Sequence, residues 1–482
     1  MKTTKRILSL LMVFVMLMSF FGTASAAQNS DWDSWWSEST KEIDAAVTMF
    51  PGDNESERYI AWYSDAAEGY VELTGEKGTE KFTAVSKKTF QGDYRLGAVV
   101  TGLKEGEYTY QCFSGDYKSE KYEFDVRIQE EFTALYLTDI HVADEKFEEN
   151  SVSKTTQKYC GVLDAAYETI NEDGKTLDLI LSAGDQASDA KRVEYVGLSA
   201  PEYIKTVPFA PTVGNHDRKS TGYRDYTFLP NEGELKFKSY VGTDYYFKQG
   251  NALFLMLDSC NCSMKDHYKF IKQTVEENED AQWIIAVLHH DMFGGREPHL
   301  NSENTMLRLL WTGIFDQFGI DLCLYGHSHY HTVSNVIYDN KTAQSLVDVN
   351  EITDPAGTIY MASASINNSC DVTDENGNEP PLGENIGHSY LTDEAIYNVL
   401  NFKGDTLEIK SYTYESDKLF DTLTITKTSK QGGHEYKNTS GILRPLIFFV
   451  SRIVNIINNI DPYQTYNEQG FEVSFFEGII GS

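Results

Sequence analysis

The sequence predicts an all-β sandwich domain followed by a layered α/β domain, and three observations support this fold class. At 482 residues the chain is too long for one ordinary domain. Strand-type segments follow one another without helices from about residue 40 to residue 128. From Phe132 onward, apolar strands alternate with helical stretches. We therefore expect domains at residues 27–128 and 129–430, preceded by a leader at 1–26 and followed by a linker and tail at 431–482.

The first 26 residues have the composition of a signal peptide. Lys2, Lys5 and Arg6 form a basic start, Ile7–Phe21 is almost wholly apolar, and Ala24–Ala26 supplies small residues for cleavage. The apolar run is short for a transmembrane helix, and an uncleaved anchor is the alternative. The leader predicts a secreted or cell-surface protein.

Residues 27–128 show the alternation of half-buried strands. Tyr59–Tyr63 and Gly69–Leu73 alternate apolar and polar residues, and Gly-containing turns such as Lys104–Gly106 separate the later segments. The further predicted strands are Ala98–Leu103, Glu107–Phe113 and Lys121–Val126. Several short strands without helices favour a β-sandwich.

Residues 129–430 alternate strands with helices. The predicted strands are Phe132–Thr138, Leu177–Ala183, Ala252–Leu257, Trp283–Leu288, Leu322–Tyr325, Thr358–Ser363 and Thr406–Thr413. The predicted helices are Lys154–Asn171, Val193–Thr206, Met264–Asn278 and Asn304–Phe318. In such α/β domains, ligands bind beyond the carboxyl ends of the strands.

The C-terminal region begins with a polar linker at Gly432–Ser440 and then becomes apolar. Within Leu446–Ile460, polar residues fall on one side of a helical projection, and Pro445 suits a helix start. This amphipathic helix either packs on the body of the protein or lies on a membrane surface as a peripheral contact.

The net charge argues against some classes of function, whereas the cysteine content leaves disulfide pairing open. The net charge of −32 argues against nucleic-acid binding through a basic surface. The same acidity opposes anionic substrates unless metal ions make the pocket positive locally. The six cysteines leave disulfide pairing open, and the sequence does not set the oligomeric state.

Five short clusters rich in His, Asp and Asn are the strongest functional signal. They are Thr138–His141, Ala183–Gln186, Val213–Asp217, Val287–His290 and Tyr325–His329. Most follow an apolar run, so their polar residues are expected at one end of one sheet. Carboxylates, imidazoles and an amide oxygen suit divalent metal ions. Two such ions can clamp a phosphate, activate a bound water and stabilise the attacking and leaving oxygens.

The ordered motifs D-x-H, G-D, G-N-H-D, a strand ending in His, and G-H-x-H resemble the calcineurin-like metallophosphoesterase superfamily over about residues 130–415. This resemblance implies a β-sandwich core flanked by helices. The segments Tyr94–Leu103 and Tyr108–Tyr110 are similar to the fibronectin-like (fibronectin III-like) N-terminal domain of purple acid phosphatases. That second match is looser.

The resemblance implies roles for individual residues. Asp139, His141 and His329 are expected to bind the first metal, with Asp185 bridging both ions. The implied ligands of the second metal are Asn215, His289 and His327. His216 is the implied acid that protonates the leaving group, and Asp217 is expected to orient it.

One departure concerns the metal type. Purple acid phosphatases have Gly where this chain has His141, and an iron-ligating Tyr where it has Ser188. The expected cofactors are therefore two divalent metal ions, Mn, Fe or Zn, without the tyrosinate–iron colour.

The expected function is an exported dinuclear-metal phosphoesterase acting on small phosphate esters, with phosphomonoesters favoured. A phosphodiesterase with the same metal core is the alternative, and a cell-surface binding or adhesion protein with a vestigial catalytic domain is the alternative of another class. Among the remaining polar residues, His290 and His331 are expected to line the pocket. Surface or loop positions are expected for His267, His299, His388 and His434. Solvation is the default for Arg218, Lys219 and Arg296, and contact with a phosphate oxygen is the alternative.

Overall fold

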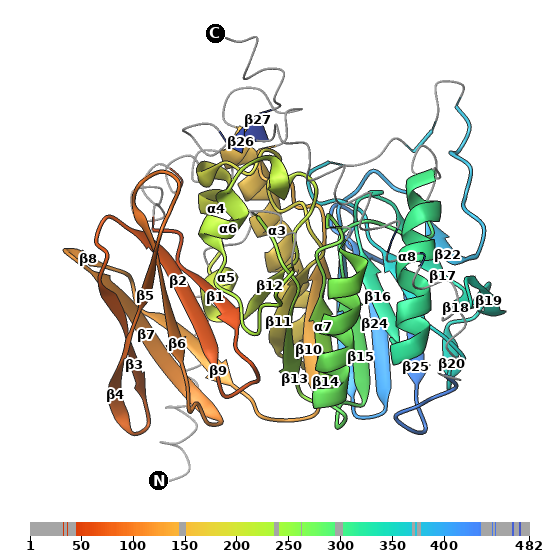
Figure 1. Cartoon of the computed structure of the whole chain (residues 1–482), viewed down its shortest axis with the longest axis horizontal. Helices are drawn as coiled ribbons and strands as arrows, with labels where there is room; N and C mark the ends of the chain where they lie inside the picture. Colours follow the sequence, from red (N-terminus) through yellow and green to blue (C-terminus); the bar gives the residue numbers. More distant parts are fainter. Residues whose placement is uncertain are drawn as a thin grey trace, which may run out of the picture.

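A computed structural model places a β-domain beside a larger α/β domain (Figure 1). It describes Trp32, Trp36, residues 45–143, 151–235, 241–261, 263–294, 302–368, 372–373 and 377–434, and short pieces at Leu446, Phe449, 465–466 and 472–473. The expected signal peptide and most of Leu446–Ile460 lie outside these residues. Among the residues described, no helix has both the length and the apolar character needed to cross a bilayer.

The front domain consists of two antiparallel sheets. The first has the order β1 (Thr48–Pro51), β2 (Arg58–Ser64), β6 (Tyr94–Val100), β5 (Val85–Lys88). The second has the order β4 (Gly78–Thr83), β3 (Gly69–Gly75), β7 (Gly106–Ser114), β8 (Tyr117–Lys118), with β9 (Tyr122–Val126) also paired to β7. Side chains from both sheets, among them Trp62, Leu96, Val71 and Tyr110, form one buried cluster. The predicted β-sandwich is confirmed.

The strands missed in this domain include β1, which is short and fully buried, and two strands without an apolar face. β4 and β5 are almost entirely exposed, so their sequences lack the alternation that reveals a half-buried strand. β6 begins at Tyr94, four residues before the predicted start at Ala98.

The α/β domain contains two seven-stranded sheets. The first has the order β12 (Phe209–Pro211), β11 (Leu177–Ser182), β10 (Phe132–Leu137), β23 (Ile396–Lys403), β24 (Thr406–Thr413), β25 (Lys418–Thr426), β20 (Glu351–Thr353). The second has the order β13 (Tyr245–Gln249), β14 (Ala252–Met256), β15 (Trp283–Val287), β16 (Leu322–Tyr325), β21 (Ile359–Ala362), β17 (His331–Ser334), β22 (Ile386–Tyr390). A hairpin of β18 (Val336–Tyr338) and β19 (Lys341–Gln344) and a pair of β26 (Thr465–Tyr466) and β27 (Glu472–Val473) complete the strands described.

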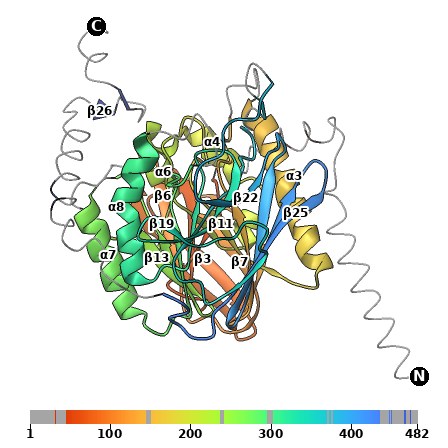
Figure 2. The ribbon, with the colours of Figure 1, turned by 90° about the vertical axis from the view of Figure 1, so that its right-hand side faces the viewer.

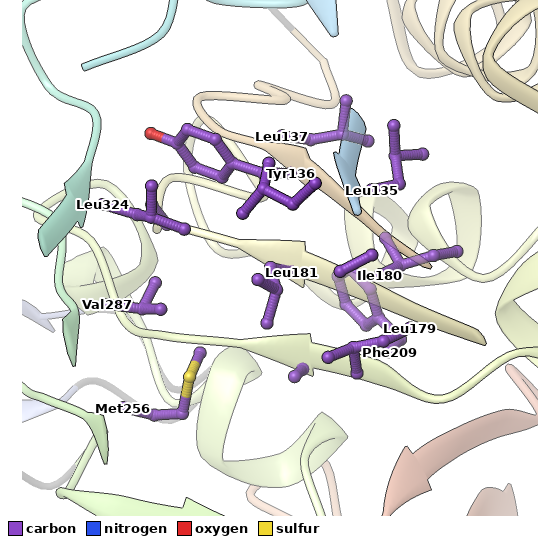
Figure 3. Close-up of a cluster of buried hydrophobic side chains, with 14 of the residues drawn as sticks. Leu135, Tyr136, Leu137, Leu179, Ile180, Leu181, Phe209, Met256, Val287 and Leu324 are labelled. Carbon is purple, nitrogen blue, oxygen red and sulfur yellow. The ribbon is translucent and has the colours of Figure 1, made fainter. Parts of the chain in front are cut away.

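The two large sheets pack face to face. Leu135, Leu181 and Phe209 of the first sheet meet Val287 and Leu324 of the second in one buried cluster (Figure 3). Each fully buried apolar side chain of this kind contributes about 1.5–3 kcal/mol to folding. The metallophosphoesterase-type β-sandwich core implied by the resemblance is therefore present.

Helices cover the outer faces of this sandwich (Figure 2). α7 (Met264–Glu277) and α8 (Ser302–Phe318) lie on the second sheet, and α3 (Ser151–Glu172) lies on the first. Successive side chains of β15 point to opposite faces of the second sheet. Ile285 and Val287 pack against the first sheet, whereas Ile284 and Ala286 pack in the cluster beneath α7 and α8.

The single helix predicted over Val193–Thr206 is wrong. The structure has two short helices there, α4 (Arg192–Leu198) and α5 (Tyr203–Thr206). Pro201 lies between them, and it lacks an amide proton and disfavours helical geometry in the residue before it.

The front domain packs directly against the first sheet and its short helices. Phe50 of β1 belongs to the large cluster of the α/β domain. The Thr48 hydroxyl donates to the Tyr226 hydroxyl of α6 (Gly222–Tyr226), and the Tyr110 hydroxyl donates to the carbonyl of Lys205. Of the six cysteines, Cys112, Cys160, Cys260 and Cys323 are described, and each is a free thiol.

Candidate metal centre

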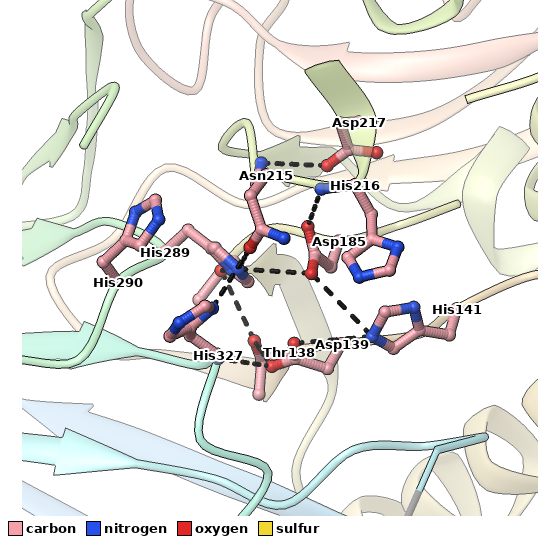
Figure 4. Close-up of polar contacts among 12 residues, drawn as sticks. Thr138, Asp139, His141, Asp185, Asn215, His216, Asp217, His289, His290 and His327 are labelled. Atoms are coloured by element: carbon pink, nitrogen blue, oxygen red, sulfur yellow. Dashed lines mark hydrogen bonds and ion pairs between the residues drawn. The ribbon is translucent and has the colours of Figure 1, made fainter. Parts of the chain in front are cut away.

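Parallel strands deliver the expected ligands to one place. β10, β11 and β12 run parallel in one sheet, and β15 and β16 run parallel in the other. The expected ligands Asp139, Asp185, Asn215, His289 and His327 follow the ends of these five strands by two to four residues. Figure 4 shows their side chains converging on a common centre. The expectation that the clusters meet is confirmed.

A first donor group joins the D-x-H motif to the last histidine of G-H-S-H. Asp139 Oδ1 lies 3.1 Å from His329 Nε2 and 3.7 Å from His141 Nε2. The two imidazole nitrogens are 3.3 Å apart. These three donor atoms lie within 4.8 Å of one another, which is close enough for all three to bind a single cation.

A second donor group forms around the amide of Asn215. Its Oδ1 lies 2.8 Å from His289 Nε2 and 3.1 Å from His327 Nδ1. His289 is held in place from behind, since its Nδ1 donates to the Ala183 carbonyl at 2.9 Å. That bond directs Nε2 toward the other donors.

Asp185 lies between the two groups. Its Oδ2 is 3.8 Å from His141 Nε2 in the first group and 3.2 Å from His289 Nε2 in the second. Among the described residues, the structure contains three groups of three neighbouring His and Asp side chains that could hold a metal ion. Asp139, His141 and Asp185 each belong to two of these groups. One buried carboxylate therefore contacts both groups, which is the arrangement that a bridging ligand requires.

The charge state of the centre fits divalent cations. Asp139 Oδ1 is buried, and two imidazole nitrogens lie within 4 Å of it. Burial opposes its charge, yet the imidazoles of His329 and His141 hold the pKa of Asp139 well below its usual range. Against the same burial effect, Asp185 raises the pKa of His289 to about 9. The carboxylate of Asp139 is therefore favoured in its charged form, which is the form that binds a cation.

The backbone at this centre is unusual. Asp139, His141, Asp185, His327 and His329 all have φ between +48° and +70°. Such left-handed conformations cost energy in residues other than glycine, and they persist where the surroundings enforce them. Five expected ligands share this feature, which supports a functional rather than a structural reason for the motifs.

Glycines in the motifs allow close approach of the ligands. A Cβ on Gly214 would lie 2.1 Å from Asp185 Oδ1, and one on Gly326 would lie 2.1 Å from Asp139 Oδ2. A Cβ on Gly184 would lie 2.5 Å from His289 Nδ1. Each motif glycine therefore makes room for a metal-site side chain.

Gly214→Ala is expected to displace Asp185 and to lower metal affinity by about 10- to 100-fold, the range seen when support of a ligand is lost. Isothermal titration of the chelated protein with Mn²⁺ measures this change. Gly102→Ala is the control, because nothing lies within 4 Å of its Cβ and only its φ of +74° is strained. Equal metal affinity of the two variants would contradict the claim that Gly214 makes room for Asp185.

His216 is oriented by backbone contacts. Its amide donates to Asp185 Oδ1 at 2.8 Å, and its Nδ1 lies 2.7 Å from the Ser188 carbonyl. A carbonyl only accepts, so Nδ1 carries a proton and Nε2 is the nitrogen left for chemistry. Ser188 also places its hydroxyl 3.4 Å from His141 Nδ1, and its carbonyl accepts from Lys219. Because His216 also lies within 4.8 Å of the His141 and Asp185 donors, geometry alone permits it to be a ligand or a proton donor.

The hydrogen-bond partner of the His216 imidazole is the Ser188 carbonyl, and the orienting role expected of Asp217 stays a prediction. Asp217 is fully buried and accepts from the Gly214 amide at 2.9 Å and from the Tyr195 hydroxyl at 2.8 Å. Burial, with the charge of Asp185, raises the pKa of Asp217 to about 7. Asp217 therefore fastens the loop on which His216 lies, and Tyr195 of α4, which no motif indicated, supports it.

The remaining histidines are mostly buried and bonded. The prediction that His290 lies beside the site agrees with its ring, 4.8 Å from that of His327. His331 and His388 each pair with Asp421 at 2.9 Å. The surface or loop prediction is wrong for His267 and His388, which lie in α7 and β22 and are buried or nearly so. His434 lies on a loop, as predicted, although it is buried. His299 and Arg296 lie outside the described residues.

Arg218 donates to the Cys260 carbonyl, and Lys219 pairs with Asp189.

His267 links α7 to the loop after β14. Its Nδ1 lies 2.7 Å from Asp244 Oδ2, and its Nε2 lies 2.7 Å from the Asn261 carbonyl. Two acceptors favour the doubly protonated ring. Although burial opposes the charge, Asp244 raises the pKa of His267 above its usual value.

His267→Gln is expected to lower stability most at mildly acidic pH. A raised folded-state pKa stabilises the fold fully below the unfolded value of about 6.5, and this stabilisation is lost as pH rises through the folded pKa. Denaturant unfolding at several pH values from 5.5 to 9 measures the difference from the parent protein. Lys269→Gln, an exposed change on the same helix, is the control. A difference that grows with pH would refute this assignment.

The comparisons with known proteins agree with this geometry. Residues 132–331 match the family model of the calcineurin-like phosphoesterases. No curated protein matches the chain. The matched range contains all seven expected ligands and His216.

Solved structures show the same fold over most of the chain. Purple acid phosphatase PPD1 from yellow lupin (Lupinus luteus) seeds is similar with a TM-score of 0.59 and 16% identity, covering 79% of this chain and 74% of the lupin chain. A structure of PhoD is similar with a TM-score of 0.52 and 10% identity, covering 86% of this chain and 98% of the PhoD chain. At such identities the likeness shows a shared fold.

Proposed function

We propose, because residues 132–331 form a domain of the calcineurin-like phosphoesterase family, that this chain is an exported dinuclear-metal enzyme that hydrolyses small phosphate monoesters. The observation that carries the proposal is the position of Asp185. Its Oδ2 lies within 4 Å of one imidazole from each donor group, so one carboxylate can serve two ions.

The residues present fit two divalent ions. Asp139, His141 and His329 would hold the first, and Asn215, His289 and His327 would hold the second, with Asp185 shared. Bound there, the ions supply positive charge to bind a phosphate and to lower the pKa of a water. Mn²⁺, Fe²⁺ and Zn²⁺ all accept such a mixed imidazole and carboxylate set. Ser188 offers no phenol, so no tyrosinate–iron absorption is expected in any metal form.

His216 is proposed to donate the proton to the leaving oxygen. Its Nδ1–H is held by the Ser188 carbonyl, which leaves Nε2 to carry the transferable proton. Lys219 binds the same carbonyl and fixes its direction. The leaving alkoxide thus departs as a neutral alcohol, and the imidazole is neutral afterwards.

Asp217 and Tyr195 are proposed as positioning residues. The carboxyl of Asp217 bonds the Gly214 amide and the Tyr195 hydroxyl, so it fixes the loop between Gly214 and His216 against α4. Their loss is expected to change the position of His216 and to leave the metal ligands in place.

Hydrolysis of a chromogenic phosphate monoester beside its diester tests the substrate class. The mature protein is supplied with Mn²⁺, and a chelated sample is the control. Chelator-sensitive turnover with a higher kcat/KM for the monoester supports the proposal. A higher kcat/KM for the diester would assign the chain to the phosphodiesterases, and no turnover with two ions bound would favour the binding protein with a vestigial site.

Export and membrane contact are separate proposals. The basic start, the apolar run Ile7–Phe21 and the small residues Ala24–Ala26 support export. Mass determination of the secreted protein tests cleavage after Ala26, and a mass that includes the leader would contradict it. Sedimentation with liposomes before and after deletion of Leu446–Ile460 tests the tail, and equal sedimentation would contradict membrane contact.

A further inference from the structure

A small cavity of about 50 Å³ lies where strands β5 and β6 of the front domain meet α6 and the residues that follow it. Lys87 of β5 and Arg95 of β6 line the cavity from the front domain, and Arg224 of α6 lines it from the α/β domain. We propose that this cavity binds a small oxyanion of the phosphate class. The proposal does not depend on the proposed function of the metal centre.

Two of these cations stand directly opposite each other on paired strands. Lys87 and Arg95 are partners in the antiparallel register of β5 and β6. The side chains of such partners lie on the same face of a sheet, where two like charges destabilise the pairing. A negative charge between the two side chains would remove this repulsion.

Arg95 is a buried cation without an acceptor. It is only 8% exposed, and within the described part of the chain its guanidinium forms no ion pair or hydrogen bond. Phe228 covers one face of the guanidinium, with the ring centre 4.7 Å away, and the edge atoms Nε and Nη1 are enclosed by protein. Nη2 is therefore the nitrogen left to contact an occupant of the cavity. Because arginine keeps its charge, its burial without a counter-charge is costly.

The lining has more positive than negative charge, although the whole chain has a net charge of −32. The charge of Arg224 is partly balanced by Asp225, at 3.2 Å. Lys87 Nζ contacts only a neutral group, the Arg224 carbonyl, at 3.4 Å. Glu232 is the acid of the lining, and it makes no ion pair with the lining cations. The charges of Lys87 and Arg95 are therefore open to an external anion.

The volume of the cavity selects a small ion. One water needs about 10–15 Å³ of such space, whereas sites for organic ligands have about 300–1,000 Å³. A cavity of about 50 Å³ admits an ion of a few heavy atoms. A tetrahedral oxyanion offers separate acceptor atoms to donors that approach from β5, β6 and α6. Hydrogen bonds between such an anion and the ammonium or guanidinium groups are among the strong ones.

Equilibrium dialysis of the metal-loaded, full mature protein with radiolabelled inorganic phosphate tests the proposal. Two phosphates per chain are expected, one at the metal centre and one in the cavity. Lys87→Ala is expected to weaken binding in the cavity by about tenfold or more, because it removes a hydrogen bond to a charged group. Its turnover is expected to equal that of the parent protein, and thermal unfolding without phosphate checks its fold.

Lys88→Ala is the matched control. Lys88 is exposed and follows Lys87 on β5, so its side chain points to the opposite face of the sheet. The two variants lose the same charge, and only Lys87→Ala is expected to change phosphate binding. Glu232→Gln removes the acid from the lining and is expected to tighten binding in the cavity by about two- to fivefold.

Two results would overturn the proposal: phosphate binding that is the same in Lys87→Ala as in the parent protein, or equal weakening in Lys87→Ala and Lys88→Ala. Failure of the proposed enzymatic function gives a different result. If the metal centre binds no phosphate, one phosphate per chain remains, and its weakening in Lys87→Ala alone still supports the cavity site.

Discussion

Asp185→Asn is expected to reduce bound metal from two ions to one or none and to lower turnover by about a thousandfold or more, since each ion supplies several kcal/mol of charge stabilisation. The substitution keeps the size of the side chain, and its amide oxygen can still accept from the His216 backbone amide. It removes the negative charge between His141 and His289. Elemental analysis and phosphate release measure the two effects.

Asp178→Asn is the matched control for Asp185→Asn. Asp178 is a partly exposed carboxylate on β11 that pairs with Arg127, far along the strand from the donor groups. Its loss is expected to lower the melting temperature while metal content stays at two ions. Two bound ions and more than a tenth of the turnover in Asp185→Asn would contradict the bridging role.

His216→Ala is expected to lower kcat by about 10²- to 10⁴-fold, the usual contribution of a positioned proton donor. The loss should be larger for an alkyl phosphate than for a nitrophenyl phosphate, because the poorer leaving group needs the proton more. Metal content is expected to stay at two ions, since the imidazole is held by Ser188 and Nε2 is reserved for the proton.

The comparison of the two esters separates the roles that geometry leaves open for His216. If His216 is a metal ligand, the variant loses a metal ion, and kcat falls by the same factor for both phosphate esters. His290→Ala is the control histidine, since its Nδ1 bonds Ser259 and its ring lies beside His327. A variant His216→Ala with one ion, or without dependence on the leaving group, would contradict the assignment as proton donor.

The sequence could predict that the expected ligands converge, because most of them lie within a few residues of the end of a strand. Apolar runs such as Phe132–Leu137 and Trp283–Val287 are recognisable as buried strands, and parallel strands bring their carboxyl ends together. The positions of Asp139 and His289 follow from that rule. The ligand-bearing strands were therefore the best predicted part of the fold.

The supporting contacts could not be predicted in the same way. Ser188 holds His216 through its carbonyl, an atom that every residue has, so no side-chain pattern reveals it. Tyr195 reaches Asp217 from a helix 22 residues earlier in the chain, and nothing in the local sequence distinguishes it from a core tyrosine. The same holds for His267, whose acceptors Asp244 and Asn261 come from separate segments.

Titration of the chelated mature protein with Mn²⁺, with turnover of a phosphate monoester followed at each addition, tests the central claim most directly. The account predicts that binding saturates at two ions per chain and that turnover rises only as the second site fills. Saturation at one ion with full turnover, or turnover in the chelated protein, would contradict a dinuclear centre built around Asp185.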